Sequence, residues 1–137
     1  MNLFILILNI NNMKKEFLTY EQAKALKELG FDEKCLWYYT THGTLIEERW
    51  YKHPNKSSWT VNTPLKQQAF RFFREKFGLA GIIEAVNKTH YEFYILPLGQ
   101  EEYVKPPNAF NTYEEAESAC IDKLIELAKE VKNGDNN

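Results

Sequence analysis

Apolar residues recur at helical spacing in three parts of the chain, and the first of these parts begins with a recognisable capping signal. Thr19 is followed three residues later by Gln22, which is the capping-box pattern found at the start of many helices. The pattern predicts a helix over residues 20–29. Gly30 follows immediately, and glycine most readily adopts the left-handed conformation that ends a helix.

The second and third helical patterns are longer. In the second, Thr63 and Pro64 provide a hydroxyl N-cap and a proline at the first helical position, and they predict a helix over residues 64–77. In the third, Thr112 repeats the capping signal, and an apolar stripe predicts a helix over residues 113–132. Because this stripe is the widest of the three, the last helix is expected to pack most deeply.

Two pairs of β-prone segments lie between the predicted helices, and each pair is joined by a short turn. The four segments are residues 35–40, 44–51, 82–86 and 91–96. They predict an α+β fold in the order α-β-β-α-β-β-α, in which two hairpins form one antiparallel sheet and three helices pack on one of its sides. The two segments rich in turn-forming residues, 52–62 and 97–111, are interpreted as loops.

The length of 137 residues is typical of one domain, which we expect to cover residues 13–132, with a frayed polar tail over 133–137. Residues 1–12 carry no charge, and their apolar run is too short to span a membrane and lacks the flanks of a secretory signal. This segment is either a buried strand or an extension outside the native domain. The second interpretation is favoured, because an uncharged apolar strand promotes aggregation.

Composition narrows the class of protein. Hydrophobic residues make up 44 % of the chain and charged residues 26 %, which is typical of a soluble globular domain. The formal net charge is −2, so the chain lacks the overall basic charge that attracts nucleic acid or anionic lipid. Cys35 and Cys120 are the two cysteines, and they form neither a disulfide framework nor a C-x-x-C motif. A disulfide scaffold, a coiled coil and a multi-span membrane protein are therefore excluded.

The sequence contains no recognisable motif for catalysis or for binding a cofactor or metal. His42, His53 and His90 have none of the spacings of zinc motifs, and we interpret them as solvated turn or loop residues, although His42 and His90 both lie at predicted hairpin tips. Cys120 falls on the apolar stripe of the last helix and is expected to be a core residue. We therefore expect no cofactor, and an enzyme with a hidden site remains the third and weakest alternative.

The helix predicted over residues 64–77 is basic, with four basic residues against one acidic residue. Arg71 and Arg74 are neighbours on one helical face, and Gln67 lies one turn before them. Such a helix can lie along phosphates or enter a groove of nucleic acid, with Lys66, Gln67, Arg71 and Arg74 as the contacts. The alternative is charge balance with the last predicted helix, in which acidic residues outnumber basic ones.

Large aromatic residues cluster in the first predicted hairpin. Because side chains alternate along a strand, Trp37 and Tyr39 share one face of it, and Trp50 and Tyr51 lie on the partner strand. A sheet that is covered by helices on one side only leaves some of these rings at the surface. Exposed tryptophan and tyrosine are typical of protein-binding surfaces. The alternative is a second covered face, formed by the loop that contains Trp59 or by a partner subunit.

Three blocks of sequence are distinctive when they are taken together: residues 13–32, 64–78 and 112–126. With these blocks, the chain from Met13 onward resembles a family of small proteins that phages and prophages of gut bacteria encode. Members of that family begin at the residue that corresponds to Met13, which supports treating residues 1–12 as an extension. The resemblance implies a mobile-element origin and a soluble setting in the cytoplasm of a bacterial host. It implies no activity, cofactor or site residue.

These patterns favour a non-enzymatic protein-interaction module that binds a protein partner or itself through the aromatic sheet face. The alternative function is nucleic-acid binding through the basic helix over residues 64–77.

Overall fold

The computed structural model describes residues 2–3, 12–47 and 58–136. Its principal helices are α2 (Tyr20–Glu28), α3 (Lys66–Phe77) and α4 (Tyr113–Gly134). Its strands are β1 (Trp37–Thr40), β2 (Leu45–Glu47), β3 (Thr60–Thr63), β4 (Leu79–Asn87) and β5 (His90–Pro97). All strand pairs are antiparallel, so the predicted α+β class is confirmed.

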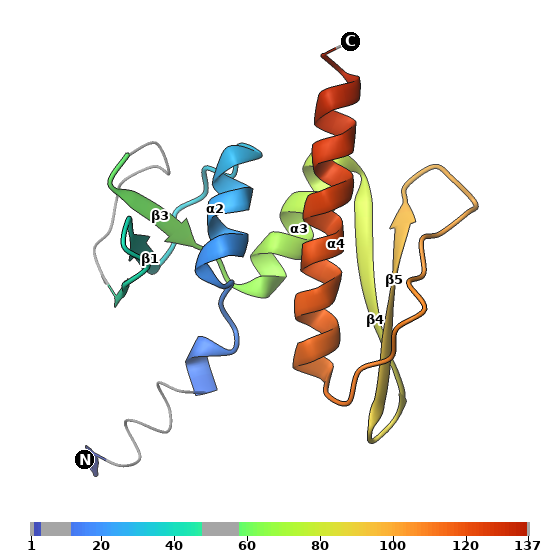
Figure 1. The fold of residues 1–137 in the computed structure, drawn as a ribbon, viewed down its shortest axis with the longest axis horizontal. Helices are drawn as coiled ribbons and strands as arrows, with labels where there is room; N and C mark the ends of the chain where they lie inside the picture. Colours follow the sequence, from blue (N-terminus) through green and yellow to red (C-terminus); the bar gives the residue numbers. More distant parts are fainter. Residues whose placement is uncertain (1, 4–11, 48–57, 137) are drawn as a thin grey trace.

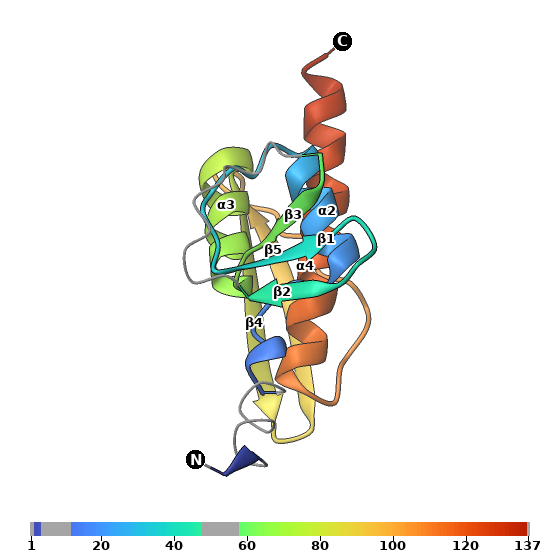
Figure 2. The same cartoon turned by 90° about the vertical axis from the view of Figure 1, so that its left-hand side faces the viewer.

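The arrangement of the strands differs from the prediction in two respects. Strand β3 lies largely within a segment that was interpreted as a loop, and it pairs with β1. The strands also form two separate sheets, in the orders β2-β1-β3 and β4-β5, instead of one. The helices lie between these sheets (Figures 1 and 2). Each sheet therefore has one face toward the helices and one face away from them.

Helix α2 begins as the capping box predicts. The Thr19 hydroxyl accepts a hydrogen bond from the Gln22 backbone N–H, and the Gln22 side-chain oxygen accepts one from the Thr19 N–H, each at 3.2 Å. The helix ends at Glu28, one residue before the predicted end. Gly30 has a φ of 94°, which is the left-handed conformation expected after the helix.

Helix α3 begins two residues later than predicted, because Thr63 belongs to β3 and pairs with Trp37. Leu65 is the N-cap residue, and its backbone N–H donates to the Gln68 side-chain oxygen at 2.9 Å. The hydroxyl cap assigned to Thr63 is therefore wrong, and Gln68 instead accepts from the backbone N–H of the N-cap residue. The helix ends before Gly78, as predicted.

Helix α4 begins at the predicted residue and ends at Gly134, two residues beyond the predicted end, and the Thr112 hydroxyl accepts from the Glu115 N–H at 3.2 Å. Asn133 and Gly134, which were expected to belong to the frayed tail, are part of the helix. The predicted apolar stripe packs against β4 and β5. Its fully buried members are Ala116, Cys120, Ile121, Leu124 and Ala128.

The three helices run in the same direction, so their C-terminal ends lie at one end of the molecule (Figure 1). Aromatic rings join α2 to α3 at this end: the ring of Phe31, just after α2, lies 5.4 Å from that of Phe72. Phe73 is fully buried beside Phe72. The core therefore lies mainly in the helical layer and on the helix-facing side of each sheet.

Candidate interaction surface

Trp37 and Tyr39 of β1 face the helices. Trp37 is only 8 % exposed, and its ring lies 5.5 Å from that of Phe17. Tyr39 is half-buried, its hydroxyl donates to the Leu18 carbonyl at 2.9 Å, and burial raises its pKa. The expectation that Trp37 and Tyr39 form an exposed contact face is therefore wrong. Helix α2 and the segment before it cover that face.

The alternation that placed Trp37 and Tyr39 on one face is nevertheless confirmed. Trp37 pairs with Thr63 and Tyr39 with Val61, and both partners are buried. Sequence reasoning identified a shared face but could not show that helices cover it. The two other predicted contacts, Trp50 and Tyr51, lie outside the described residues.

The β4–β5 hairpin has a face that no described helix covers (Figure 1). Gly81 points toward α3 and α4, since a Cβ there would lie 2.8 Å from both Phe70 and Cys120. Because side chains alternate, the even-numbered residues of both strands point the other way as far as Ala85. We call this surface the outer face. It comprises Ile82, Glu84, Val86, Glu92, Tyr94 and Leu96, with Tyr103 and Lys105 from the segment after β5. The register shifts after Ala85, and the exposed Val86 lies at this shift.

The outer face combines exposed apolar area with a polar centre. Val86 is 53 % and Tyr103 is 59 % exposed, and the Tyr103 ring lies 5.5 Å from that of Tyr94. Both rings line a hollow of about 250 Å³ together with Glu84 and Lys105. Aromatic rings around a few polar groups are typical of protein-binding surfaces.

Glu92 organises the polar part of the outer face. One carboxylate oxygen lies 2.9 Å from His90 Nε2, and the other forms an ion pair with Lys105. These hydrogen bonds, first from His90 and then from Lys105, hold the pKa of the Glu92 carboxyl below its usual value. The contact with Lys105 anchors the segment after β5 against the hairpin, whereas the contact with His90 lies within β5.

That segment also covers the outer edge of β5. Ile95 exchanges two backbone hydrogen bonds of 2.8 Å with Val104, and Tyr91 exchanges two more with Phe110. Because these groups point away from β4 and the bonding direction alternates along a strand, the backbone groups of Glu92 and Tyr94 point toward β4. The segment was interpreted as a loop, and its extended bridges are the part of this surface that sequence reasoning missed.

At the opposite edge of the hairpin, no described strand pairs with β4. The register pairs Ile82 with Tyr94 and Glu84 with Glu92, so these residues bond within the hairpin. The backbone groups of Gly81, Ile83 and Ala85 therefore point outward from β4. Among the described residues, none of these three has a backbone hydrogen-bond partner at that edge. We call this surface the β4 edge.

Helix α3 supplies only part of the predicted nucleic-acid contact. Lys66 is 6 % exposed, and its ammonium group lies 3.2 Å from the Glu117 carboxylate of α4. The assignment of Lys66 as a contact is therefore wrong, because the charge joins two helices inside the fold. This pair is the charge balance between the two helices that the sequence offered as an alternative.

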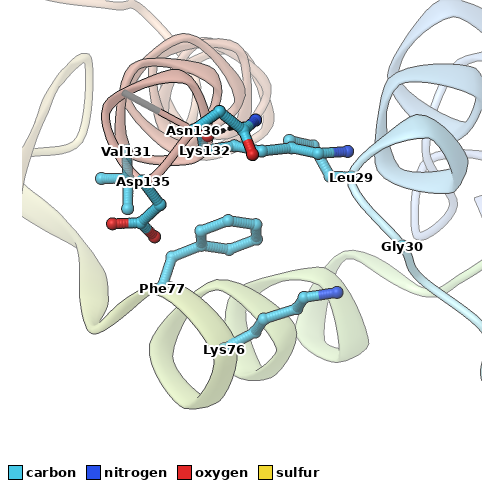
Figure 3. A pocket seen from close by; sticks show the side chains of 8 residues that line it. All are labelled: Leu29, Gly30, Lys76, Phe77, Val131, Lys132, Asp135 and Asn136. Atoms are coloured by element: carbon cyan, nitrogen blue, oxygen red, sulfur yellow. Dashed lines mark hydrogen bonds between the residues drawn. The ribbon is translucent and has the colours of Figure 1, made fainter.

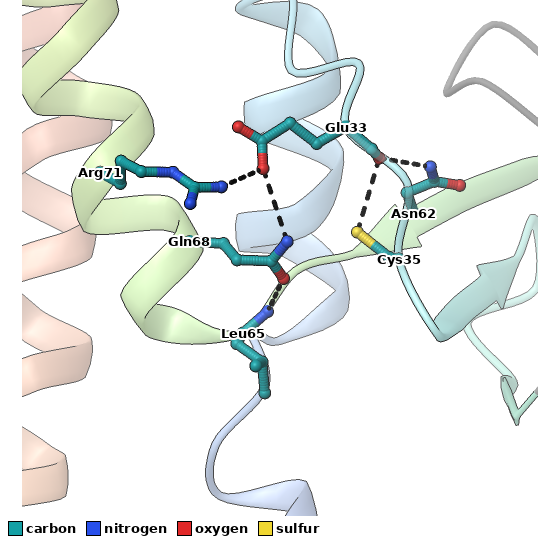
Figure 4. A network of polar contacts seen from close by, with 6 residues as sticks. All are labelled: Glu33, Cys35, Asn62, Leu65, Gln68 and Arg71. Atoms are coloured by element: carbon teal, nitrogen blue, oxygen red, sulfur yellow. Dashed lines mark hydrogen bonds and ion pairs between the residues drawn. The ribbon is translucent and has the colours of Figure 1, made fainter.

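The other three predicted contacts on α3, Gln67, Arg71 and Arg74, are exposed. Arg71 forms an ion pair of 2.8 Å with Glu33, which also accepts a longer hydrogen bond from Gln68 (Figure 4). This network attaches the segment after α2 to α3. Arg74 is therefore an exposed basic residue of this helix without an ion-pair partner among the described residues. The ammonium group of Lys76 lies over the rings of Phe72 and Phe77.

Neither cysteine has the surroundings of a nucleophile. Burial raises the pKa of both Cys35 and Cys120 to about 12, so both thiols stay protonated near neutral pH. His42 and His90 lie in hairpins on opposite sides of the helical layer, and His53 lies outside the described residues (Figure 1). Within residues 2–3, 12–47 and 58–136, no group of three potential metal ligands occurs.

The C-terminal ends of the three helices enclose a hollow of about 340 Å³ (Figure 3). Phe77 lies in it between the side chains of Lys76 and Asp135. Lys132 reaches across and donates to the Glu28 carbonyl at 2.8 Å. The lysines complement the negative ends of the helix dipoles, so this hollow has a structural explanation.

A second, mostly apolar hollow of about 320 Å³ lies near the start of β1. It is lined in part by the exposed side chains of Met13, Leu36 and Leu65.

In comparisons with known proteins, no family model, no curated protein and no solved structure matches the chain. None of the helices in the described part of the chain is long and apolar enough to cross a membrane.

Proposed function

We propose that the protein is a non-enzymatic protein-interaction module that binds through the β4–β5 hairpin. The observation that carries the proposal is the open β4 edge, where Gly81, Ile83 and Ala85 present backbone donors and acceptors without partners among the described residues. An extended polypeptide can add a strand at such an edge, and its main-chain hydrogen bonds then supply much of the affinity.

The adjacent outer face supports the same proposal. A strand added to β4 places alternate side chains beside Ile82 and Val86. Tyr94 and Tyr103 extend this apolar area across the hairpin. Main-chain pairing and side-chain contacts therefore act on one continuous surface. The proposed binding surface is therefore the second hairpin, whereas the first was expected from the sequence.

The test is selection from a random-peptide display library with the purified protein as bait, followed by fluorescence anisotropy with the selected peptides. Ala85→Pro removes an outward N–H and is expected to abolish peptide binding, whereas Ala85→Ser keeps the N–H and should bind normally. Tyr103→Ala should weaken binding. Leu36→Ala removes an equally exposed apolar side chain outside the hairpin and should not. Peptides that bind all four variants equally well would refute the proposal.

Nucleic-acid binding through α3 is the second candidate, and the exposure of Gln67, Arg71 and Arg74 on one helical face supports it. If it is correct, the affinity for a labelled oligonucleotide falls steeply with salt, and the double variant Arg71→Ala and Arg74→Ala abolishes binding. Lys129→Ala removes an exposed charge from α4 and serves as the control. Binding that is insensitive to salt and to both arginines would exclude α3 as the contact.

We further propose that the module acts in the cytoplasm of a bacterial host and originates from a mobile element. The support is the resemblance of the three sequence blocks at residues 13–32, 64–78 and 112–126 to phage and prophage proteins.

A further inference from the structure

Strand β4 lacks the features that usually prevent edge strands from pairing with other chains. Its nine residues contain no proline and no lysine, and Glu84 is the only charged residue. Natural edge strands are commonly short or protected by charge, proline or a covering segment. The partner strand β5 has such a covering segment, whereas no segment in the described part of the chain pairs with the free edge of β4.

We propose that the β4 edge pairs antiparallel with β4 of a second copy of this chain, which gives a homodimer with a continuous four-stranded sheet. This inference rests on the proposed function, since it names one partner for the same edge. Closed two-fold dimers, in which one patch meets itself, are the commonest oligomers.

The positions of the outward-pointing residues select the register. Only a register that pairs outward-pointing residues with one another forms hydrogen bonds between the copies. A two-fold axis through Ile83 pairs Ile83 with its counterpart and Gly81 with Ala85 of the second copy. All three outward-pointing residues of each copy then have partners.

Charge and burial exclude the neighbouring registers. A two-fold axis at Glu84 places two carboxylates directly opposite each other, which is destabilising. An axis at Ile82 requires Ala85 to pair with Leu79, which is only 5 % exposed. In the register centred on Ile83, Glu84 instead lies opposite Ile82 of the second copy.

The two halves of β4 are also complementary. Residues from Leu79 to Ile83 are buried or half-buried beside α3, whereas residues from Glu84 to Asn87 are exposed. Figure 2 shows α3 beside the first half of the strand. Antiparallel pairing therefore brings the exposed half of each strand next to α3 of the other copy.

The charges near these two halves are opposite. Helix α3 carries the exposed Arg74, and the acidic first turn of α4 contains Glu114 and Glu115. That turn lies near the exposed half of β4, because Ala85 pairs with Tyr91, whose ring contacts Tyr113 at 6.2 Å. Pairing therefore brings α3 of each copy toward the acidic first turn of α4 in the other copy. The two-fold symmetry produces this contact twice. This charge complementarity favours a second copy over an unrelated extended peptide.

The test is sedimentation velocity of the purified full chain over a wide concentration range. We expect a reversible monomer–dimer equilibrium. Ile82→Glu places a carboxylate opposite Glu84 of the second copy in two symmetric pairs, and should raise the dimer Kd about tenfold or more. Ile82→Lys is the matched variant, and it should leave the Kd unchanged or lower it because it creates two opposite-charge pairs.

Ala85→Pro should prevent dimerisation and Ala85→Ser should preserve it, with circular dichroism confirming that each variant folds. A chain that is monomeric throughout, or a dimer that responds equally to Ile82→Glu and Ile82→Lys, would overturn the inference. Self-association and peptide selection are separate measurements. A monomeric protein that still binds selected peptides at the β4 edge would therefore refute only the dimer.

Discussion

At the scale of single residues, Gly81 shows how closely the helices pack on β4. A Cβ at this position would lie 2.8 Å from Cys120 Sγ and from Phe70, and 3.0 Å from Leu124. We predict that Gly81→Ala lowers the free energy of unfolding by about 1–2 kcal/mol, because the added methyl group overpacks the core. Urea denaturation measures the change. Gly134→Ala is the control, since a Cβ there has open space, and it should not destabilise the protein.

The buried pair of Lys66 and Glu117 predicts a second effect at the residue scale. We expect Lys66→Met to cost about 3–5 kcal/mol at neutral pH, because it leaves the Glu117 carboxylate buried without its partner. The double variant Lys66→Met and Glu117→Leu should recover most of this loss. Chemical denaturation of both variants checks the prediction. A double variant as unstable as Lys66→Met would show that packing, not charge, dominates at this site.

The pKa of Glu117 gives the same pair a pH dependence. Burial raises this pKa above the ordinary value of 4.5, and Lys66 offsets the rise only in part. The folded state therefore holds the proton more tightly than the unfolded state. Stability from this group should fall as pH rises from 4.5 through the folded-state pKa. The slope of unfolding free energy against pH should be less negative in Glu117→Gln, and an unchanged slope would contradict the assignment.

At the scale of elements, Gln22 connects two helices as well as capping one. Its side-chain nitrogen donates to the Ser118 carbonyl and hydroxyl and, at 2.9 Å, to the Asp122 carboxylate of α4. We predict that Gln22→Glu destabilises the protein by about 1–3 kcal/mol, because it keeps the capping acceptor but loses these donors and faces Asp122. Thermal unfolding measures the loss. Adding Asp122→Asn should restore stability, and failure to do so would exclude repulsion as the cause.

The helices and strands also differ in how well the sequence predicted them. Caps and apolar stripes are local signals, so the ranges of α2 and α4 were predicted within about one or two residues, as is usual at helix ends. Strand β3 was missed because Thr60–Thr63 has no strong alternation and forms only by pairing with β1. The start of α3 was misplaced for the same reason, since pairing holds Thr63 in the strand.

The candidate site depends on which faces the elements cover, and that is not a local property. Alternation correctly grouped Trp37 with Tyr39 on one face of β1. The alternation of side chains does not show whether an apolar face is exposed or is covered by helices, as this one is. Lys66 was misassigned because only the packing of α3 on α4 brings Glu117 beside it. The β4 edge became visible only when the separation into two sheets was known.

At the scale of the whole molecule, the parallel helices add their dipoles, and lysines offset the negative end (Figure 1). Lys132 donates to the Glu28 carbonyl at the end of α2, whereas Lys129, one turn earlier, has no observed hydrogen bond among the described residues. We predict that Lys132→Gln costs about 0.3–1 kcal/mol at low ionic strength and that Lys129→Gln costs less. Because salt screens exposed charges, the difference between the two variants should shrink in concentrated sodium chloride. Urea denaturation at two salt concentrations measures it, and equal losses in both variants would show that the position of Lys132 at the helix ends has no special effect.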